Sequence, residues 1–281
     1  MAVAMVSDPD GNKVMLRFAR SLGVMAAAIV LATVAVAGAA AQSSSIEQIA
    51  PTGRLRAALV KIPFLAKPDR ASGHLKGVAP DLAEEFARRL DLPLEPVAFD
   101  TPNAAIAALR SGAADITFLA PTPERVALID FGPAFMEMEM TLLVPSSSPI
   151  ASQADADQAG RKIVVYERTA VEEMLKKKMT KATIVRVPIF GHKQALALLR
   201  SGEADAFADL RDALMSYQPE LPGSRVIAGN YGSNALAIGY AKDRPATAVF
   251  VKVFTTSVIA SDFVTQAIEK AGVRGAAAPG G

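Results

Sequence analysis

Two stretches of the chain decide its fold: residues 107–115 read AALRSGAAD, and residues 197–205 read ALLRSGEAD. In each, an apolar run ends at a glycine, which is typical of a helix C-terminus, and an aspartate then precedes a second apolar run. The interval from Gly112 to Gly202 is the length of a small α/β lobe. We interpret the stretches as the same element of two similar lobes, although Leu-Arg-Ser-Gly is also a generic helix stop that chance could repeat.

Around the first stretch, strand and helix patterns alternate. Short apolar runs bounded by turn residues predict strands, and apolar residues at helical spacing predict helices. Leu82, Phe86 and Leu90 share one helical face and are therefore expected in the core. The expected order is strand 55–60, helix 80–90, strand 94–99, helix 103–110 and strand 116–119.

The second stretch has similar surroundings. Residues 136–140 read MEMEM, and this period of two predicts a strand with buried methionines rather than a metal site.

Alternating strands and helices predict an α/β fold with a parallel-rich sheet in each lobe. The further expected elements are strands 162–166, 183–187, 204–208 and 236–240, and helices 170–178, 193–200, 245–260 and 263–271.

The chain is expected to leave the first lobe once and return to it. Crossings near Val144-Pro145 and at 229–233 would then form a hinge. The predicted division is a first lobe at 53–143 and 233–272, a second lobe at 144–232, and a flexible Ala-, Gly- and Pro-rich tail at 273–281.

The N-terminus has the three parts of a secretory signal peptide. Lys13, Arg17 and Arg20 form a basic region, an apolar run follows from Leu22 to Ala37, and small residues lead to Gln42. We therefore expect cleavage between Ala41 and Gln42, a signal peptide at 1–41 and a periplasmic mature protein. A membrane anchor is the alternative interpretation of the apolar run, and Met15 could be the true start.

Composition excludes several classes of protein. The formal net charge is +2 and there is no Trp, so a nucleic-acid partner is not expected. The absence of Cys excludes disulfides and thiolate sites, and the two histidines, His74 and His192, lie in no metal-ligand spacing. We expect no metal, no cofactor and no catalytic constellation.

Two charged residues stand where ligands bind in open α/β sheets, beyond the carboxyl ends of strands. Arg125 follows the predicted strand 116–119, and Asp209 follows the predicted strand 204–208. An arginine fork can bind a carboxylate and an aspartate can bind an ammonium, so together they could clamp a zwitterion. The alternatives are a surface arginine paired with Glu124 or Asp130, and an aspartate that caps a helix.

The chain resembles the family 3 extracellular solute-binding proteins, the polar amino-acid receptors of ABC importers. The similarity covers residues 53–272. The motifs that carry it are GRLR at 53–56, GVAPDLA at 77–83, LRSG at 109–112 with DI at 115–116, TPER at 122–125, and IDF at 129–131 with Pro133.

The resemblance implies a type II periplasmic-binding-protein fold with the ligand cleft between two lobes. The family arginine that grips the ligand carboxylate matches Arg125, and the acid that grips the amine matches Asp209. Ligand-contacting hydroxyls of the family match Thr169, at a second-lobe helix start, and Thr117, on a first-lobe strand.

Departures from the family pattern leave the ligand's identity open. Ala120 stands beside the arginine where a small hydroxyl is expected, and Glu167 and Arg168 add charge near the pocket where the family prefers Gly and Ser. Ala120 and Arg168 are therefore among the expected ligand-binding residues. Phe64 could supply the apolar wall of the site or pack in the core.

The resemblance therefore implies a monomeric, non-enzymatic receptor that captures a small carboxylate-bearing solute, such as an amino acid, for an ABC permease. One alternative is an enzyme like the periplasmic cyclohexadienyl dehydratases, which resemble these receptors, with Glu167 as the acid. The other is a ligand sensor without a transport role.

Overall fold

The computed structural model describes residues 3–7, 13–17, 46–69 and 71–280, in two units, Met1–Glu47 and Gln48–Gly281. In the first unit, β1 (Val3–Ser7) pairs antiparallel with β2 (Lys13–Arg17). The apolar run and the cleavage site of the expected signal peptide lie outside the described residues, so that expectation stays a prediction.

The second unit is built on one mixed sheet with the strand order β10-β9-β11-β8-β13-β7-β3-β6. Each half of the sheet has three parallel strands and an antiparallel fourth, so the two halves repeat one pairing pattern. The first half contains β3 (Leu55–Val60), β6 (Leu94–Phe99), β7 (Ile116–Leu119) and β13 (Gly232–Tyr240); the second contains β8 (Asp130–Val144), β9 (Lys162–Tyr166), β10 (Thr183–Val187) and β11 (Ala206–Leu210).

The two repeated stretches have the same local structure, as expected. Helix α3 (Pro102–Ser111) ends at Gly112 and α7 (His192–Ser201) ends at Gly202, with φ of 74° and 75°. Glycine adopts this left-handed conformation without the steric cost of a Cβ. The repeat in the sequence is therefore a repeat in the fold.

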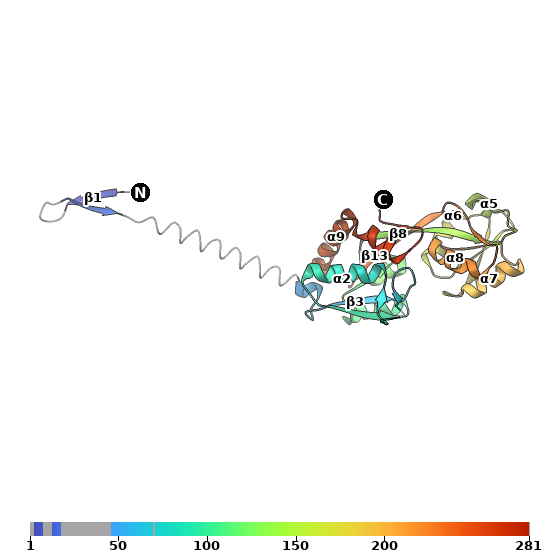
Figure 1. Ribbon diagram of the computed structural model, residues 1–281, viewed down its shortest axis with the longest axis horizontal. Coiled ribbons are helices and arrows are strands. Elements are labelled where there is room, and N and C mark those ends of the chain that lie inside the picture. Colours follow the sequence, from blue (N-terminus) through green and yellow to red (C-terminus); the bar gives the residue numbers. More distant parts are fainter. Residues whose placement is uncertain (1–2, 8–12, 18–45, 70, 281) are drawn as a thin grey trace. The chain divides into compact units, whose positions relative to one another are not determined.

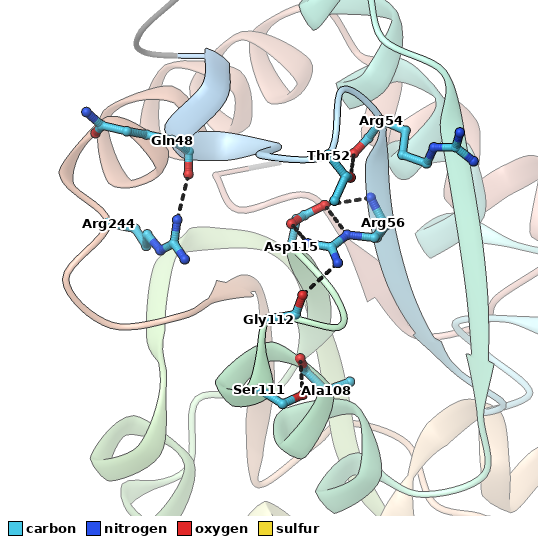
Figure 2. A network of polar contacts seen from close by, with 9 residues as sticks. All are labelled: Gln48, Thr52, Arg54, Arg56, Ala108, Ser111, Gly112, Asp115 and Arg244. Atoms are coloured by element: carbon cyan, nitrogen blue, oxygen red, sulfur yellow. Dashed lines mark hydrogen bonds and ion pairs between the residues drawn. The ribbon is translucent and has the colours of Figure 1, made fainter.

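The aspartate of the first stretch fastens its strand to the neighbouring one. Asp115 Oδ2 accepts the backbone N–H of Arg56 at 2.8 Å, and Oδ1 pairs with Arg56 Nη2 at 2.6 Å. Figure 2 shows the same guanidinium reaching the Gly112 carbonyl, 2.6 Å from Nη1. The pair ties the helix end and both strands together at the amino end of the sheet.

Asp205 repeats this arrangement in the second half. Its Oδ2 accepts the backbone N–H of Lys162 at 2.8 Å, and its Oδ1 pairs with Arg161 Nη1 at 2.6 Å. These aspartates are structural, and they leave the carboxyl ends of the strands free.

Helices cover both halves of the sheet (Figure 1). In α2 (Val78–Leu90), the predicted core residues Leu82, Phe86 and Leu90 are buried. Phe86 packs against Phe250 and Phe254 of α9 with ring centroids 4.8 Å away in each case. The other helices are α4 (Pro123–Leu128), α5 (Gln153–Ala156), α6 (Ala170–Lys178), α8 (Arg211–Tyr217), the 3-10 helix η1 (Gln218–Glu220), α9 (Pro245–Ala260) and α10 (Phe263–Ala271).

Among the described residues, no single helix is long and apolar enough to cross a membrane; α9 and α10 meet that test only as a pair bent by 72°.

Strand β8 is longer than the MEMEM pattern indicates. Met136, Met138 and Met140 are buried and Glu137 is exposed, as expected. The strand continues through residues 141–143, which pair with β11 in the second half. The chain thus changes halves inside β8, before the crossing expected near Val144-Pro145.

The C-terminal segment differs from the expected flexible tail. Ala276 and Ala277 form β14, which pairs antiparallel with Met138 and Glu137 of β8. This strand covers backbone of β8 that the sheet would otherwise leave unpaired. The remaining short strands are β4 (Lys67–Pro68), β5 (Leu75–Lys76) and β12 (Arg225–Val226).

Candidate ligand-binding site

A cavity of about 220 Å³ lies at the carboxyl ends of the parallel strands. Residues from both halves line it: Leu119 at the end of β7, Tyr166 at the end of β9 and Asp209 on β11. Parallel strands place their carboxyl ends at one edge, so residues distant in sequence converge there. The sequence-predicted residues that line the cavity are Arg125, Asp209, Thr169, Phe64 and Ala120.

Arg125 supplies a half-buried cation without an acidic partner in the described structure. It lies on α4, and its Nη1 donates to the Ala120 carbonyl at 3.0 Å. The alternative partner Asp130 instead pairs with Lys242 at 3.2 Å. Burial lowers the pKa of Arg125 from its usual value, although an arginine stays charged at any physiological pH. Its remaining N–H donors are available to a bound anion.

Asp209 supplies a buried acid. It lies within β11 rather than after the strand, opposite Thr141 of β8, and only 7% of its surface is exposed. Its Oδ1 accepts the Leu210 N–H at 2.8 Å, and helix α8 has no side-chain cap, so the alternative role as an N-cap is wrong. Burial raises the pKa of Asp209 to about 7. Among the described residues it forms no ion pair.

Three buried or partly buried tyrosines lie close enough to Asp209 for its charge to act on them. Burial raises the pKa values of Tyr166, Tyr217 and Tyr231, and the Asp209 carboxylate adds to each shift. The Tyr166 and Tyr217 hydroxyls are 3.5 Å apart, and His192 stacks on Tyr217 with centroids 4.7 Å apart. The acid therefore stands in a site of low polarity.

The two predicted threonines have different positions. Thr169 lines the cavity, but its hydroxyl donates to the Tyr166 carbonyl at 2.9 Å and accepts the Glu172 N–H at 3.1 Å, so it caps α6. Thr117 is fully buried outside the cavity lining, and its hydroxyl donates to the Ala58 carbonyl at 2.8 Å. The structure thus places Thr117 outside the cavity lining, contrary to the expectation that its hydroxyl contacts a ligand.

The charged residues before α6 also lie outside the cavity lining. Glu167 and Arg168 are both exposed. Arg168 has φ of 58°, the left-handed conformation that glycine adopts most easily. The structure thus places Arg168 outside the cavity lining, contrary to the expectation that it contributes to the site.

Most of the lining is apolar, and many of its residues were not predicted from the sequence. Phe64 does belong to the wall. Loop residues have no periodicity that reveals a cavity, whereas Tyr166 could have been found as the last residue of a predicted strand. The lining residues that were not predicted from the sequence include Ile62, Leu119, Ile189, Phe190, Tyr217, Asn234 and Leu236.

The site thus combines a guanidinium, a carboxylate and apolar walls. Neither charge has an ionic partner in the described part of the chain, and each is costly to bury alone. A ligand that carries one negative and one positive group would supply both missing partners.

The chain is similar to known proteins in sequence and in fold. The family model described as bacterial extracellular solute-binding proteins, family 3, matches residues 61–270. No curated protein sequence matches the chain significantly.

Solved structures share the fold. A receptor for L-cysteine from Neisseria gonorrhoeae is 22% identical with a TM-score of 0.63, and the match covers 82% of this chain and 95% of that one. A Streptococcus pneumoniae amino-acid ABC transporter substrate-binding protein bound to L-arginine is 22% identical, with a TM-score of 0.62 over 80% and 97% of the two chains. An ancestral amino-acid-binding protein, a precursor of cyclohexadienyl dehydratase, is 25% identical, with a TM-score of 0.62 over 80% and 97%.

Proposed function

Because the chain belongs to the family 3 bacterial extracellular solute-binding proteins and has their type II periplasmic-binding-protein fold, we propose that it captures an amino acid and presents it to an ABC importer. The observation that carries the proposal is the pair of ionically unpartnered groups, Arg125 and Asp209, in one apolar cavity. Two solved relatives support the proposal: one is bound to L-arginine, and the other is a receptor for L-cysteine.

In the proposed complex, Arg125 binds the ligand carboxylate through parallel N–H donors. The first turn of α6 faces the same cavity through Thr169, Ala170 and Val171, so its free backbone N–H groups can add to the carboxylate site. Thr169 then acts by holding the helix start in place. Asp209 binds the α-ammonium.

We propose that the halves of the sheet close on the ligand as lobes. Strands β8 and β13 connect them, so bending of these strands would open and close the cavity. The proposed lobes are the predicted ranges, 53–143 with 233–272 and 144–232, except that residues 141–143 join the second lobe because they pair with β11. The periplasmic location, the signal peptide, the ABC permease partner and the monomeric state belong to the same proposal.

A ligand screen tests the proposal. At a ligand concentration of 100 Kd, binding should add about 2.7 kcal/mol to the free energy of unfolding and raise the Tm by roughly 5–10 °C. Differential scanning fluorimetry of the mature protein against the amino acids should find such a ligand, and small-angle scattering should give a smaller radius of gyration with it. No shift with any amino acid would contradict the proposal.

The affinity should depend on pH because Asp209 must be ionised to bind an ammonium. Its pKa is about 7 in the empty site, and a bound ammonium would lower it. Binding then releases a proton below pH 7, so the affinity should fall by up to about tenfold per pH unit between pH 7 and pH 5. Calorimetry at several pH values measures this, and a flat profile would contradict the role of Asp209.

The second candidate is a dehydratase, because one solved relative is an ancestral amino-acid-binding protein described as a precursor of cyclohexadienyl dehydratase. The acid that the sequence suggested, Glu167, lies outside the cavity lining. The observation that supports this second function is the pKa of Asp209, because a carboxyl group with a pKa of about 7 can serve as a general acid. Incubation with prephenate or arogenate should leave both unchanged; conversion of either would favour the enzyme.

A further inference from the structure

We infer that the site selects amino acids whose side chain is uncharged and mainly apolar. This inference rests on the proposed function and extends it to the part of the cavity that would hold the ligand's side chain. It follows from the charges that remain once the α-carboxylate and α-ammonium are bound, and from the chemistry of the walls.

Among the described residues that line the cavity, no charged group is left to pair with a charged side chain of the ligand. Its lining contains one arginine, Arg125, and two aspartates, Asp209 and Asp212. Asp212 Oδ1 already accepts the backbone N–H of Arg274 at 3.0 Å and its Nε at 3.2 Å. With Arg125 and Asp209 taken by the ligand's two ends, a side-chain ammonium or carboxylate would be buried without an ionic partner, which is strongly unfavourable.

The hydroxyl groups in the lining form hydrogen bonds within the protein. Thr169 caps α6, Ser216 Oγ donates to the Ala213 carbonyl at 2.6 Å, and the Tyr166 hydroxyl donates to the Tyr217 hydroxyl at 3.5 Å. The Tyr217 hydroxyl keeps its own hydrogen, which carries no charge. The amide of Asn234 is also in the lining and offers hydrogen bonds but no charge. A polar but uncharged ligand atom could be accommodated there.

The walls are apolar on both sides of the cavity. Ile62 and Phe64 face it from the loop after β3, and Ile189 and Phe190 face it from the loop between β10 and α7. Ile189 and Phe190 are 47% and 52% exposed although they line a cavity, so a ligand could cover apolar surface that is now open to water.

The backbone at Phe190 supports a role for this loop. Phe190 has φ of 66°, which is rare for a bulky residue, and Gly191 packs so closely against the Pro188 carbonyl that a Cβ would lie 2.8 Å from it. A strained aromatic residue exposed at a cavity edge indicates a functional constraint on the loop. We assign Phe190 to the wall that contacts the ligand's side chain.

The test compares ligands of matched shape. Norleucine and lysine have the same unbranched carbon chain and differ in the terminal ammonium, and leucine, phenylalanine, arginine and glutamate extend the comparison. Calorimetric titration should show lysine binding about 100-fold or more weakly than norleucine. Lysine, arginine or glutamate binding as tightly as norleucine would overturn the inference while leaving the proposed function intact. Failure of every amino acid to bind would overturn the proposed function itself.

A matched pair of variants tests the wall. Phe190→Ala should weaken binding of leucine or phenylalanine by about 10-fold or more, because apolar contact in the pocket is lost. Val249→Ala removes apolar surface that is 65% exposed on α9, away from the cavity lining, and should leave the affinity unchanged. Wild-type affinity in Phe190→Ala would remove this residue from the wall and overturn that assignment.

Discussion

Replacing Arg125 with alanine should weaken binding of the amino acid by roughly 30-fold to several thousand-fold while leaving the fold intact. Truncating one partner of a buried charge pair costs about 2–5 kcal/mol, much of it from the charge left unpaired, and about 1.4 kcal/mol corresponds to tenfold. Here the unpaired group would be the ligand carboxylate. Arg125→Lys should restore only part of the affinity, since an ammonium cannot reproduce the two parallel bonds of the guanidinium fork.

The chain offers a matched control for this variant. Arg168 is an exposed arginine outside the cavity lining, close in sequence to Thr169 of α6. Arg168→Ala removes the same charge and should leave the affinity nearly unchanged. Calorimetric titration of the variants, with circular dichroism to check the fold, measures the difference. Equal losses of affinity in the two variants would indicate a general electrostatic effect. Wild-type affinity in a folded Arg125→Ala protein would contradict the proposal that Arg125 binds the ligand carboxylate.

Replacing Asp209 with asparagine should have opposite effects on binding and on stability. The affinity for an amino acid should fall by roughly 30-fold to several thousand-fold, because the buried ammonium loses its counter-charge. The affinity for a matched acid without the amine, such as 4-methylpentanoate in place of leucine, should change little. Uniform loss for both ligands would make Asp209 a structural residue rather than an ammonium partner.

The stability effect follows from the raised pKa of Asp209. The pKa is about 7 in the folded protein and 3.8 as the ordinary value, so the folded form holds the proton more tightly and its stability falls as pH rises from about 4 through 7. At pH 8 the ionised, buried group costs at most about 4 kcal/mol, and below pH 4 it costs nothing. Asp209→Asn should therefore raise the free energy of unfolding in the ligand-free protein at pH 8 and not at pH 4, as denaturant titrations would show. An equal change at both pH values would contradict this explanation.

The sequence by itself determined the elements, the repeat and the family. Strand and helix periodicities gave β3, β6, β7, β9 and β10 with their observed bounds, because short amphipathic and buried segments carry local signals. The family resemblance and the type II fold class are confirmed. Motif spacing also singled out Arg125 and Asp209, the two charges that the structure brings to one cavity; their role as ligand contacts stays a prediction.

Only the tertiary structure decided which neighbouring residues share that cavity. Thr117 matches a family position and Arg168 departs from the family pattern; the Thr117 hydroxyl donates to the adjacent strand, and Arg168 is exposed. Phe190 and Asn234 carry no local signal and still line the site. Pairing of β14 with β8 likewise orders a tail that composition alone marks as flexible. The physical reason is that the hydrophobic periodicity of a segment indicates which face of that helix or strand is buried. The residues of a cavity wall depend instead on how elements distant in sequence pack together, and no single segment determines that packing.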